Sequence, residues 1–239
     1  MTWYRRFRYG VKKKCTKHDL LSLIGKLSFA AKIIPPGRTF LRHLIDLSTT
    51  VARPSHHISL NNSAQEDIQW WLDFLPTWSG KQKILDCRTT TCPDIELSTE
   101  ASGELGFGIY FKGDWISEIW PAQFKSHSIA WKELFPICIA CRIWAERFVG
   151  KKLLFHCDNK AIVNIWYKHT SKCPEIAQLL RKLFFIAAKL NFTVNISHIS
   201  GTSNVLADAL SRSQVCRFLQ LAPGANPLQT RIPPSVWNT

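Results

Sequence analysis

The chain has 239 residues, of which 46% are hydrophobic and 20% are charged. This composition is typical of a globular protein with its own core and excludes an intrinsically disordered chain. Lysine and arginine number 31 against 17 aspartate and glutamate residues, a net charge of +14, and +9 of it falls in residues 1–93. A positive surplus of this size favours an anionic partner, with nucleic acid as the first candidate.

The first part of the chain has the apolar spacing of helices. Residues 1–16 are basic and aromatic without a clear period. Apolar residues then recur at helical spacing from Lys17 to about Ile34, from Phe40 to Leu47, and from Ser63 to Pro76. Residues 17–80 are therefore predicted to form a small, basic unit of three helices.

A different pattern follows a polar connector that runs from Gly80 to Pro93. Alternating short apolar runs, turn residues and longer helical runs predict nine elements in the order β-β-β-α-β-α-α-β-α. Their ranges are 95–98, 109–111, 115–120, 128–148, 152–157, 159–168, 174–190, 192–199 and 204–218. This order predicts an α/β domain over residues 94–212, with a mixed five-stranded sheet and helices on its faces. Residues 213–239 are predicted to be a C-terminal tail, loose from Pro223 onward.

The eight cysteines predict a reducing environment. The chain starts without an apolar signal segment, and no stretch is long and apolar enough to span a bilayer. An intracellular protein with reduced thiols is therefore expected, in the cytoplasm or the nucleus. Cys138 and Cys141 form a C-x-x-C in an apolar helical run, where core packing is favoured over zinc binding.

Two carboxylates stand where predicted strands end. Glu100 follows the first strand and Asp158 follows the fourth. Each has a simpler explanation, because Glu100 suits a surface turn and Asp158 suits the N-cap of the next helix. If the two strands are neighbours, however, their ends lie about 5 Å apart, which suits two carboxylates that share a metal site.

Two further carboxylates lie in predicted helices. Glu133 falls in the apolar row of the long helix, where a carboxylate is costly to bury unless it is paired or bound to metal. The alternative is a Glu at the edge of that row, paired with Lys132 or Arg142. Asp208 lies in the first turns of the last helix, where interaction with the helix dipole is the alternative explanation.

These carboxylates belong to four short motifs, Ser98–Ser102, Trp131–Leu134, His156–Ala161 and Asn204–Arg212. Together the motifs make residues 94–212 resemble the ribonuclease H domain of retroelement reverse transcriptases, of DIRS or gypsy-like type. Residues 17–80 are similar to the segment that joins polymerase and nuclease in DIRS-type elements. No Tyr-x-Asp-Asp occurs, so no polymerase activity is expected, and the missing polymerase portion is a candidate partner.

The resemblance implies a fold, a substrate and a set of site residues. The fold is ribonuclease H-like, and the substrate is an RNA–DNA hybrid whose RNA strand is cut. Two Mg²⁺ ions, with Mn²⁺ as a substitute, would be held by Glu100, Glu133, Asp158 and Asp208. His198 would assist proton transfer or product release, unless it only bonds to the backbone. Substrate contacts fall to Ser102, Asn159 and Asn204.

Glu100 departs from the family pattern, which has Asp at this position. The extra methylene moves the carboxylate by about 1.5 Å, while catalytic groups tolerate errors of about 0.5 Å. A catalytically weak or inactive nucleic-acid-binding relic of a reverse transcriptase is therefore the main alternative. A recombinase-like nuclease that acts on DNA is the third hypothesis.

Overall fold

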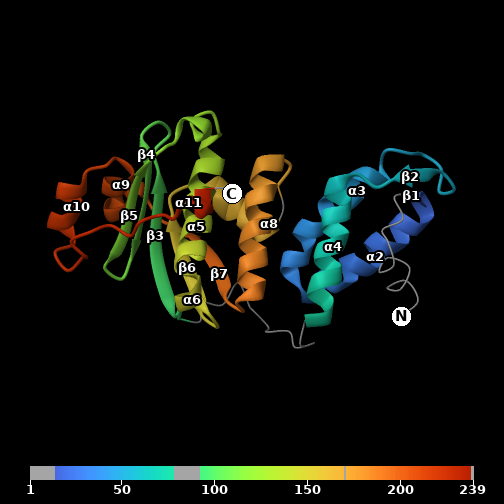
Figure 1. Cartoon of the computed structure of the whole chain (residues 1–239), viewed down its shortest axis with the longest axis horizontal. Coiled ribbons are helices and arrows are strands. Elements are labelled where there is room, and N and C mark those ends of the chain that lie inside the picture. The colour runs from blue at the N-terminus through green and yellow to red at the C-terminus, as the bar shows by residue number, and fades with distance from the viewer. Residues whose placement is uncertain (1–13, 78–91, 170, 238–239) are drawn as a thin grey trace. The chain divides into compact units, whose positions relative to one another are not determined.

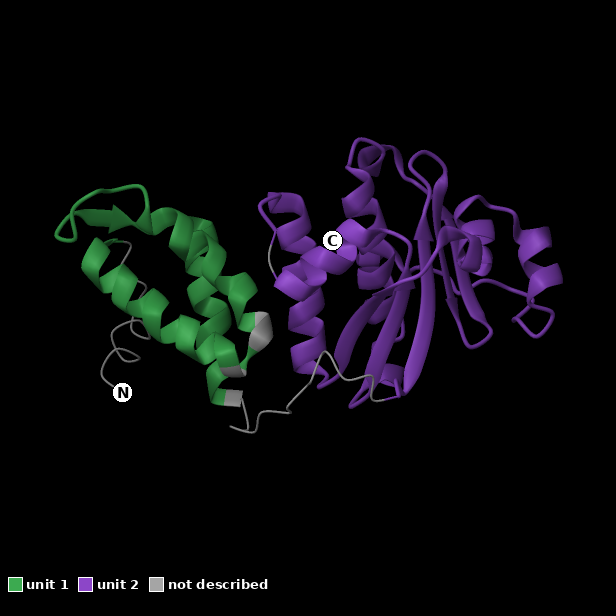
Figure 2. Cartoon of the chain, turned by 180° about the vertical axis from the view of Figure 1, so that it is seen from behind, with its two compact units in different colours: residues 1–86 green, residues 87–239 purple. Residues whose placement is uncertain are grey.

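The structure is a computed structural model that describes residues 14–77, 92–169 and 171–237. It divides into two compact units, residues 1–86 and residues 87–239 (Figure 2). Most of the expected basic start, residues 1–16, and most of the connector from Gly80 to Pro93 lie outside the described residues.

The first unit is helical, as the apolar spacing predicts. Its helices are α2 (Lys17–Ile33), the 3₁₀ helix η1 (Pro35–Leu41), α3 (Arg42–Ser48) and α4 (Asn62–Thr77). The Thr16 side chain caps α2 by accepting a hydrogen bond from the Asp19 backbone N–H. Two short strands, β1 (Lys14–Thr16) and β2 (His57–Ser59), also pair antiparallel. They are not predicted, because three residues are too few to show an alternating pattern.

The second unit is built on one five-stranded sheet, with strand order β5-β4-β3-β6-β7 (Figure 1). The strands β3 (Ile95–Ala101), β4 (Gly106–Phe111) and β5 (Asp114–Ile119) form an antiparallel meander. The strands β6 (Lys152–Cys157) and β7 (Thr193–His198) run parallel to β3. The predicted mixed sheet is therefore confirmed, and the first and fourth strands of the prediction are neighbours.

Helices cover both faces of this sheet. They are α5 (Ile129–Ile143), α6 (Ala145–Phe148), α7 (Lys160–Lys168), α8 (Pro174–Lys189), α9 (Val205–Ser211), α10 (Val215–Leu221) and α11 (Pro234–Trp237). Phe107 packs edge-on against Phe135 of α5, while its neighbour Gly108 meets α9. Since adjacent strand residues point to opposite faces, α5 and α9 lie on opposite sides of the sheet.

Two of the predicted helices are each divided in two. The long helix ends as α5, because Trp144 leaves the helical region with φ −101° and ψ 22°, and α6 follows. The last helix is divided into α9 and α10 at Ser213, which has a φ of 57°. A left-handed residue cannot continue a right-handed helix, and nothing in the apolar spacing marks this position.

The segment after Pro223 is not a loose tail, so that part of the prediction is wrong. The Trp115 indole N–H donates to the Asn226 carbonyl at 2.7 Å, and the Thr230 N–H donates to the Trp115 carbonyl at 2.8 Å. Farther along, the Arg142 guanidinium donates to the Val236 carbonyl at 3.1 Å. β5 is an edge strand with unpaired backbone groups, and this segment satisfies some of them.

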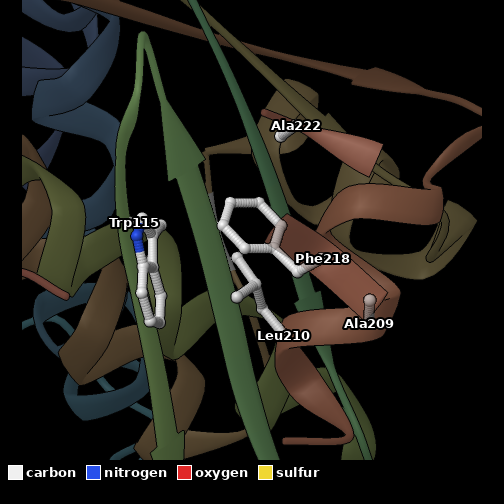
Figure 3. Packing of buried hydrophobic residues seen from close by; sticks show 5 residues of the cluster. All are labelled: Trp115, Ala209, Leu210, Phe218 and Ala222. Carbon is white, nitrogen blue, oxygen red and sulfur yellow. The ribbon is translucent and has the colours of Figure 1, made fainter. Parts of the chain in front are cut away.

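A hydrophobic cluster fastens α9 and α10 to the sheet. Its buried members are Trp115, Ala209, Leu210, Phe218 and Ala222 (Figure 3). The Phe218 ring lies 5.3 Å from the Trp115 ring and 5.7 Å from the Tyr110 ring, measured between centroids. The position of α9 therefore depends on packing from residues beyond 212.

The cysteines of the described part are all free thiols. Cys138 and Cys141 are buried in α5, and burial raises the pKa of the Cys138 thiol to about 12. Both behave as core residues, as predicted. Among the described helices, none has the length and apolar character needed to cross a membrane.

Candidate metal centre

The strand register brings Glu100 and Asp158 together. In the parallel pair of β3 and β6, Ser98 lies opposite His156. Continued by two residues, past the end of β6, this register places Glu100 beside Asp158, about one strand spacing or 5 Å away. The charge of Asp158 accordingly raises the pKa of Glu100. Glu100 lies within β3 rather than in a turn, and its side chain is half-buried. The surface-turn explanation is therefore wrong.

Asp158 is not the N-cap of the following helix. That position belongs to Asn159, whose side-chain oxygen accepts hydrogen bonds from the backbone N–H groups of Ala161 at 2.9 Å and Ile162 at 3.4 Å. A Cβ built on Gly201 would lie 3.3 Å from an Asp158 carboxylate oxygen. The 3₁₀ helix η3 (Gly201–Ser203) thus lies against Asp158 and leaves room for its side chain.

Glu133 approaches the same place from α5. Its side chain is 2% exposed. Lys132 donates instead to the carbonyls of Gly103 and Lys125, and Arg142 donates to the C-terminal segment, so the predicted alternative of a paired Glu at the helix edge is wrong. Apolar packing of α5 against β3 is what carries this carboxylate into the interior.

Cys157 is a neighbour that the sequence analysis did not single out. Its Sγ lies 3.8 Å from a Glu133 oxygen and donates to it. Ligand atoms of Glu133, Cys157 and Asp158 all lie within 4.8 Å of one another. Burial, followed by the charge of Glu133, raises the pKa of the Cys157 thiol well above its usual value. The only sequence signal for this neighbour was its place directly before Asp158.

Asp208 reaches the site because α9 packs very closely on β4. Gly108 lies opposite Glu100 in the antiparallel pair of β3 and β4. A Cβ built on Gly108 would lie 2.5 Å from the Ala207 carbonyl oxygen and 2.5 Å from Leu210 Cβ. The missing side chain therefore lets α9 approach the sheet, and Asp208 is near enough to raise the pKa of Glu100.

Asp208 and Glu100 each have a polar partner. Arg212, one helical turn beyond Asp208, donates to its carboxylate at 2.7 Å. Asn204 is 2% exposed, and its amide Nδ2 donates to Glu100 Oε2 at 2.8 Å and to the Thr99 carbonyl at 2.9 Å.

Two other predicted residues, Ser102 and His198, lie at the ends of β3 and β7. Ser102 follows β3, and its hydroxyl accepts from the backbone N–H groups of Glu104 and Leu105. His198 is the exposed last residue of β7 and lies opposite Cys157 in the parallel register. His198 therefore lies one strand spacing from Cys157, the residue that precedes Asp158.

Two of the carboxylates, Glu133 and Glu100, have raised pKa values. Burial is the largest cause of the shift at Glu133, followed by the charges of Glu100 and Asp158, and the pKa reaches about 9. The pKa of Glu100 is raised to about 7 by burial and then by Asp158, while the Asn204 hydrogen bond opposes the increase. Buried carboxylates held this close are unfavourable unless a proton or a cation neutralises them. The oxygen-rich donor set fits a hard divalent cation such as Mg²⁺.

A comparison with protein families matches residues 143–214 to a family described as reverse transcriptase-like. The match covers less than half of the chain and includes β6, α7, α8, β7 and α9. Asp158, His198 and Asp208 therefore lie inside it, whereas Glu100 and Glu133 lie before it. Among curated proteins, no sequence matches this chain.

Solved structures that are similar to this chain include two of ribonuclease H and one of a reverse transcriptase, all at low identity. The N-terminal domain of Rv2228c from Mycobacterium tuberculosis is 14% identical, with 54% of this chain and 99% of that chain covered and a TM-score of 0.36. Ribonuclease H1 from Halobacterium salinarum is 10% identical, with 52% and 98% covered and a TM-score of 0.39. A foamy viral protease-reverse transcriptase bound to double-stranded DNA is 13% identical, with 77% and 34% covered and a TM-score of 0.34. Because these scores are below 0.5, the fold is assigned from the strand order and directions described above.

Proposed function

We propose that the chain is a retroelement-derived endonuclease that cuts the RNA strand of an RNA–DNA hybrid. The observation that carries this proposal is the convergence of buried and half-buried carboxylates from β3, α5, the residue after β6 and α9, at the carboxyl ends of neighbouring parallel strands. Ligand sites in α/β sheets gather at such ends. The reverse transcriptase-like match over residues 143–214 supports the same class of protein.

Glu100, Glu133, Asp158 and Asp208 are the proposed ligands of two divalent cations, Mg²⁺ or Mn²⁺. When bound, such a pair of cations activates water for attack on the phosphodiester and stabilises the leaving oxygen. The residues of the chain hold the carboxylates in place from four separate elements and exclude bulk water from Glu133. His198, exposed at the end of β7, is proposed to move a proton at the mouth of the site.

Substrate binding is proposed to rest on positive charge and on polar residues beside the carboxylates. The net charge of +14 favours binding to phosphates, and contact with 2′-hydroxyls would distinguish RNA from DNA. Ser102, Asn159 and Asn204 are the proposed polar contacts. We also propose that the chain derives from a DIRS-type or gypsy-like element and that it is located inside the cell. Its proposed partner is the missing polymerase portion of such an element.

A cleavage assay tests this function. Full-length protein is incubated with an RNA–DNA hybrid labelled on the RNA strand, in Mg²⁺ and separately in Mn²⁺. RNA cleavage that is lost in Asp158→Asn and preserved in the control Glu104→Gln is expected, because Glu104 is exposed and outside the carboxylate cluster. No RNA cleavage in either metal would reject the proposal, and preferred cutting of duplex DNA would favour a recombinase-like nuclease.

Two observations favour a second candidate, a nucleic-acid-binding relic with weak or no catalysis. Glu100 is longer than the Asp that the resemblance implies, and Asp208 is already engaged by Arg212 at 2.7 Å. This candidate predicts salt-sensitive hybrid binding without cleavage, and cleavage that appears in Glu100→Asp. Comparing wild type with Glu100→Asp in the same assay separates the two candidates.

A further inference from the structure

Asn204 does not use its side chain in the ordinary way for its position. It precedes α9 as the N-cap residue, yet its side chain makes no capping hydrogen bond. Instead the side chain is buried, and Nδ2 reaches β3, where it donates to Glu100 Oε2 at 2.8 Å and to the Thr99 carbonyl at 2.9 Å. Asn is a common N-cap residue, but the Asn204 side chain points away from its own helix and toward the Glu100 carboxylate.

The same residue connects two carboxylates that come from different elements. The Asn204 carbonyl accepts a hydrogen bond from the Asp208 backbone N–H at 2.9 Å. Its side chain holds Glu100, so one residue joins the start of α9 to the end of β3. Movement of Asn204 would therefore change the position of both Glu100 and Asp208.

The amide orientation costs a hydrogen bond. Asn204 Oδ1 is buried and has no hydrogen-bond partner in the described part of the chain. Buried polar atoms without partners are rare in folded proteins, which indicates that the two bonds from Nδ2 set the orientation. In this orientation the Glu100 carboxylate and the Thr99 carbonyl each accept a hydrogen bond, whereas Oδ1 accepts none.

This contact depends on the length of the Glu100 side chain. Shortening Glu100 to Asp would withdraw the carboxylate by about one C–C bond, or about 1.5 Å. A hydrogen bond of 2.8 Å would then become a separation beyond hydrogen-bond reach. The bond from Nδ2 to Thr99 involves only the backbone of β3 and would survive the change.

We propose that Asn204 is a positioning residue for Glu100, which holds the longer carboxylate where the metal site needs it. This inference rests on the proposed function of the carboxylate cluster. It assigns the Asn204 side chain a contact inside the protein, in addition to or in place of the proposed contact with substrate. Asn204 and Glu100 are then a matched pair, so the effect of removing Asn204 should be larger beside Glu100 than beside Asp at the same position.

The test is a double-mutant cycle on metal affinity, with the full chain and Mn²⁺ as the probe. Electron paramagnetic resonance of free Mn²⁺ measures the dissociation constant for wild type, Asn204→Ala, Glu100→Asp and the double variant. We expect Asn204→Ala to weaken binding at least fivefold beside Glu100 and less than twofold beside Asp at position 100. An equal factor in both backgrounds would overturn the proposal, because Asn204 would then act independently of Glu100.

Asn195→Ala is the matched control. Asn195 lies in β7, and its side-chain oxygen accepts from the Ile196 N–H at 3.0 Å, away from the carboxylates. Its removal should leave the Mn²⁺ dissociation constant unchanged. A loss as large as that of Asn204→Ala would overturn the proposal by showing that any such truncation loosens the site.

A second measurement separates this inference from the proposed function. Urea unfolding of the same four proteins in EDTA needs neither metal binding nor cleavage. The midpoint shift caused by Asn204→Ala should be smaller in the Glu100→Asp background, and identical shifts in both backgrounds would contradict the pairing. If wild type binds no Mn²⁺, the proposed function fails, while the unfolding cycle still decides whether Asn204 and Glu100 are coupled.

Discussion

Glu133 is a carboxylate with almost no access to solvent, and its nearest charged neighbours are also carboxylates. Burial and the charges of Glu100 and Asp158 raise its pKa to about 9. The hydrogen bonds from the Ala101 backbone and the Cys157 thiol only partly offset this. Without a cation, Glu133 is therefore a source of instability when ionised.

Replacing Glu133 by Gln removes that charge and keeps the shape. In EDTA at pH 8, Glu133→Gln should unfold at a higher temperature than wild type, because Gln is already neutral, whereas Glu133 must take up a proton when the protein folds at this pH. Mn²⁺ binding and RNA cleavage should both be lost. Thermal unfolding followed by circular dichroism measures the first effect, with Glu104→Gln as the exposed control. A lower unfolding temperature than wild type would contradict the assignment of Glu133 as a buried acid with a raised pKa.

The stability of the metal-free protein should depend on pH. The folded pKa values of Glu100 and Glu133 are about 7 and about 9, above the unfolded value near 4.5. The folded state therefore binds more protons, and this contribution to stability is fully present below about pH 4.5 and is lost as pH rises toward 9. Other titrating groups add to the profile, so the comparison with Glu133→Gln isolates this contribution.

Unfolding temperatures measured in EDTA from pH 5 to pH 9 check this dependence. Wild type should lose stability across the range, and Glu133→Gln should lose less of it between pH 7 and pH 9. Added Mg²⁺ should recover stability at pH 8 in wild type, since a bound cation neutralises the carboxylates. Parallel profiles for the two proteins would rule out the raised pKa of Glu133.

At the scale of elements, the approach of α9 to β4 decides where Asp208 lies. The contact is possible only because Gly108 has no side chain, as its built Cβ would lie 2.5 Å from backbone and side-chain atoms of α9. Gly108→Ala should destabilise unit 2 by about 1–3 kcal/mol, the usual cost of overpacking, and weaken Mn²⁺ binding. Urea unfolding measures this decrease in the free energy of unfolding. Gly103→Ala is the control, because nothing lies within 4 Å of its built Cβ.

α10 supports α9 from its other end. Phe218 is fully buried against Trp115 and Tyr110, so Phe218→Ala should cost about 3–5 kcal/mol of unfolding free energy. Leu221→Ala on the same helix is the control, because Leu221 is 50% exposed and should change stability very little. Similar unfolding midpoints for the two variants would show that α10 contributes nothing to the fold.

At the scale of the whole molecule, charge is divided between two compact units. Residues 1–86 carry 14 basic and 6 acidic side chains, and residues 87–239 carry 17 and 11. The carboxylates all lie in the second unit. A fragment of residues 87–239 should therefore bind Mn²⁺ as tightly as the full chain but bind hybrid more weakly.

The salt dependence of hybrid binding tests whether the first unit contributes to phosphate binding. The slope of log affinity against log salt reflects the number of phosphates neutralised. We expect a shallower slope for the fragment than for the full chain, by fluorescence anisotropy with a catalytically blocked Asp158→Asn background. Equal slopes would show that the first unit makes no phosphate contacts.

Much of the fold follows from local patterns. The apolar run of β6 and the helical spacing of α5 and α8 predict those elements because burial on one face leaves a period in the residues. Glu133 stands out for the same reason, as a charged residue in an apolar row. Short or irregular features carry no such period, so the pairing of β1 with β2 and the break at Ser213 are seen only in the structure.

The sequence, with the resemblance that its motifs carry, was enough to indicate the α/β order, the basic surplus and four candidate carboxylates. The place where the carboxylates come together depends on tertiary contacts, which are the register of β3 with β6, the absence of a side chain at Gly108 and the close packing of α9. The inward turn of Asn204 toward Glu100 and the attachment of the C-terminal segment to β5 are likewise tertiary features. Local patterns record which face of an element is buried, whereas these contacts join residues far apart in sequence and leave no periodic trace.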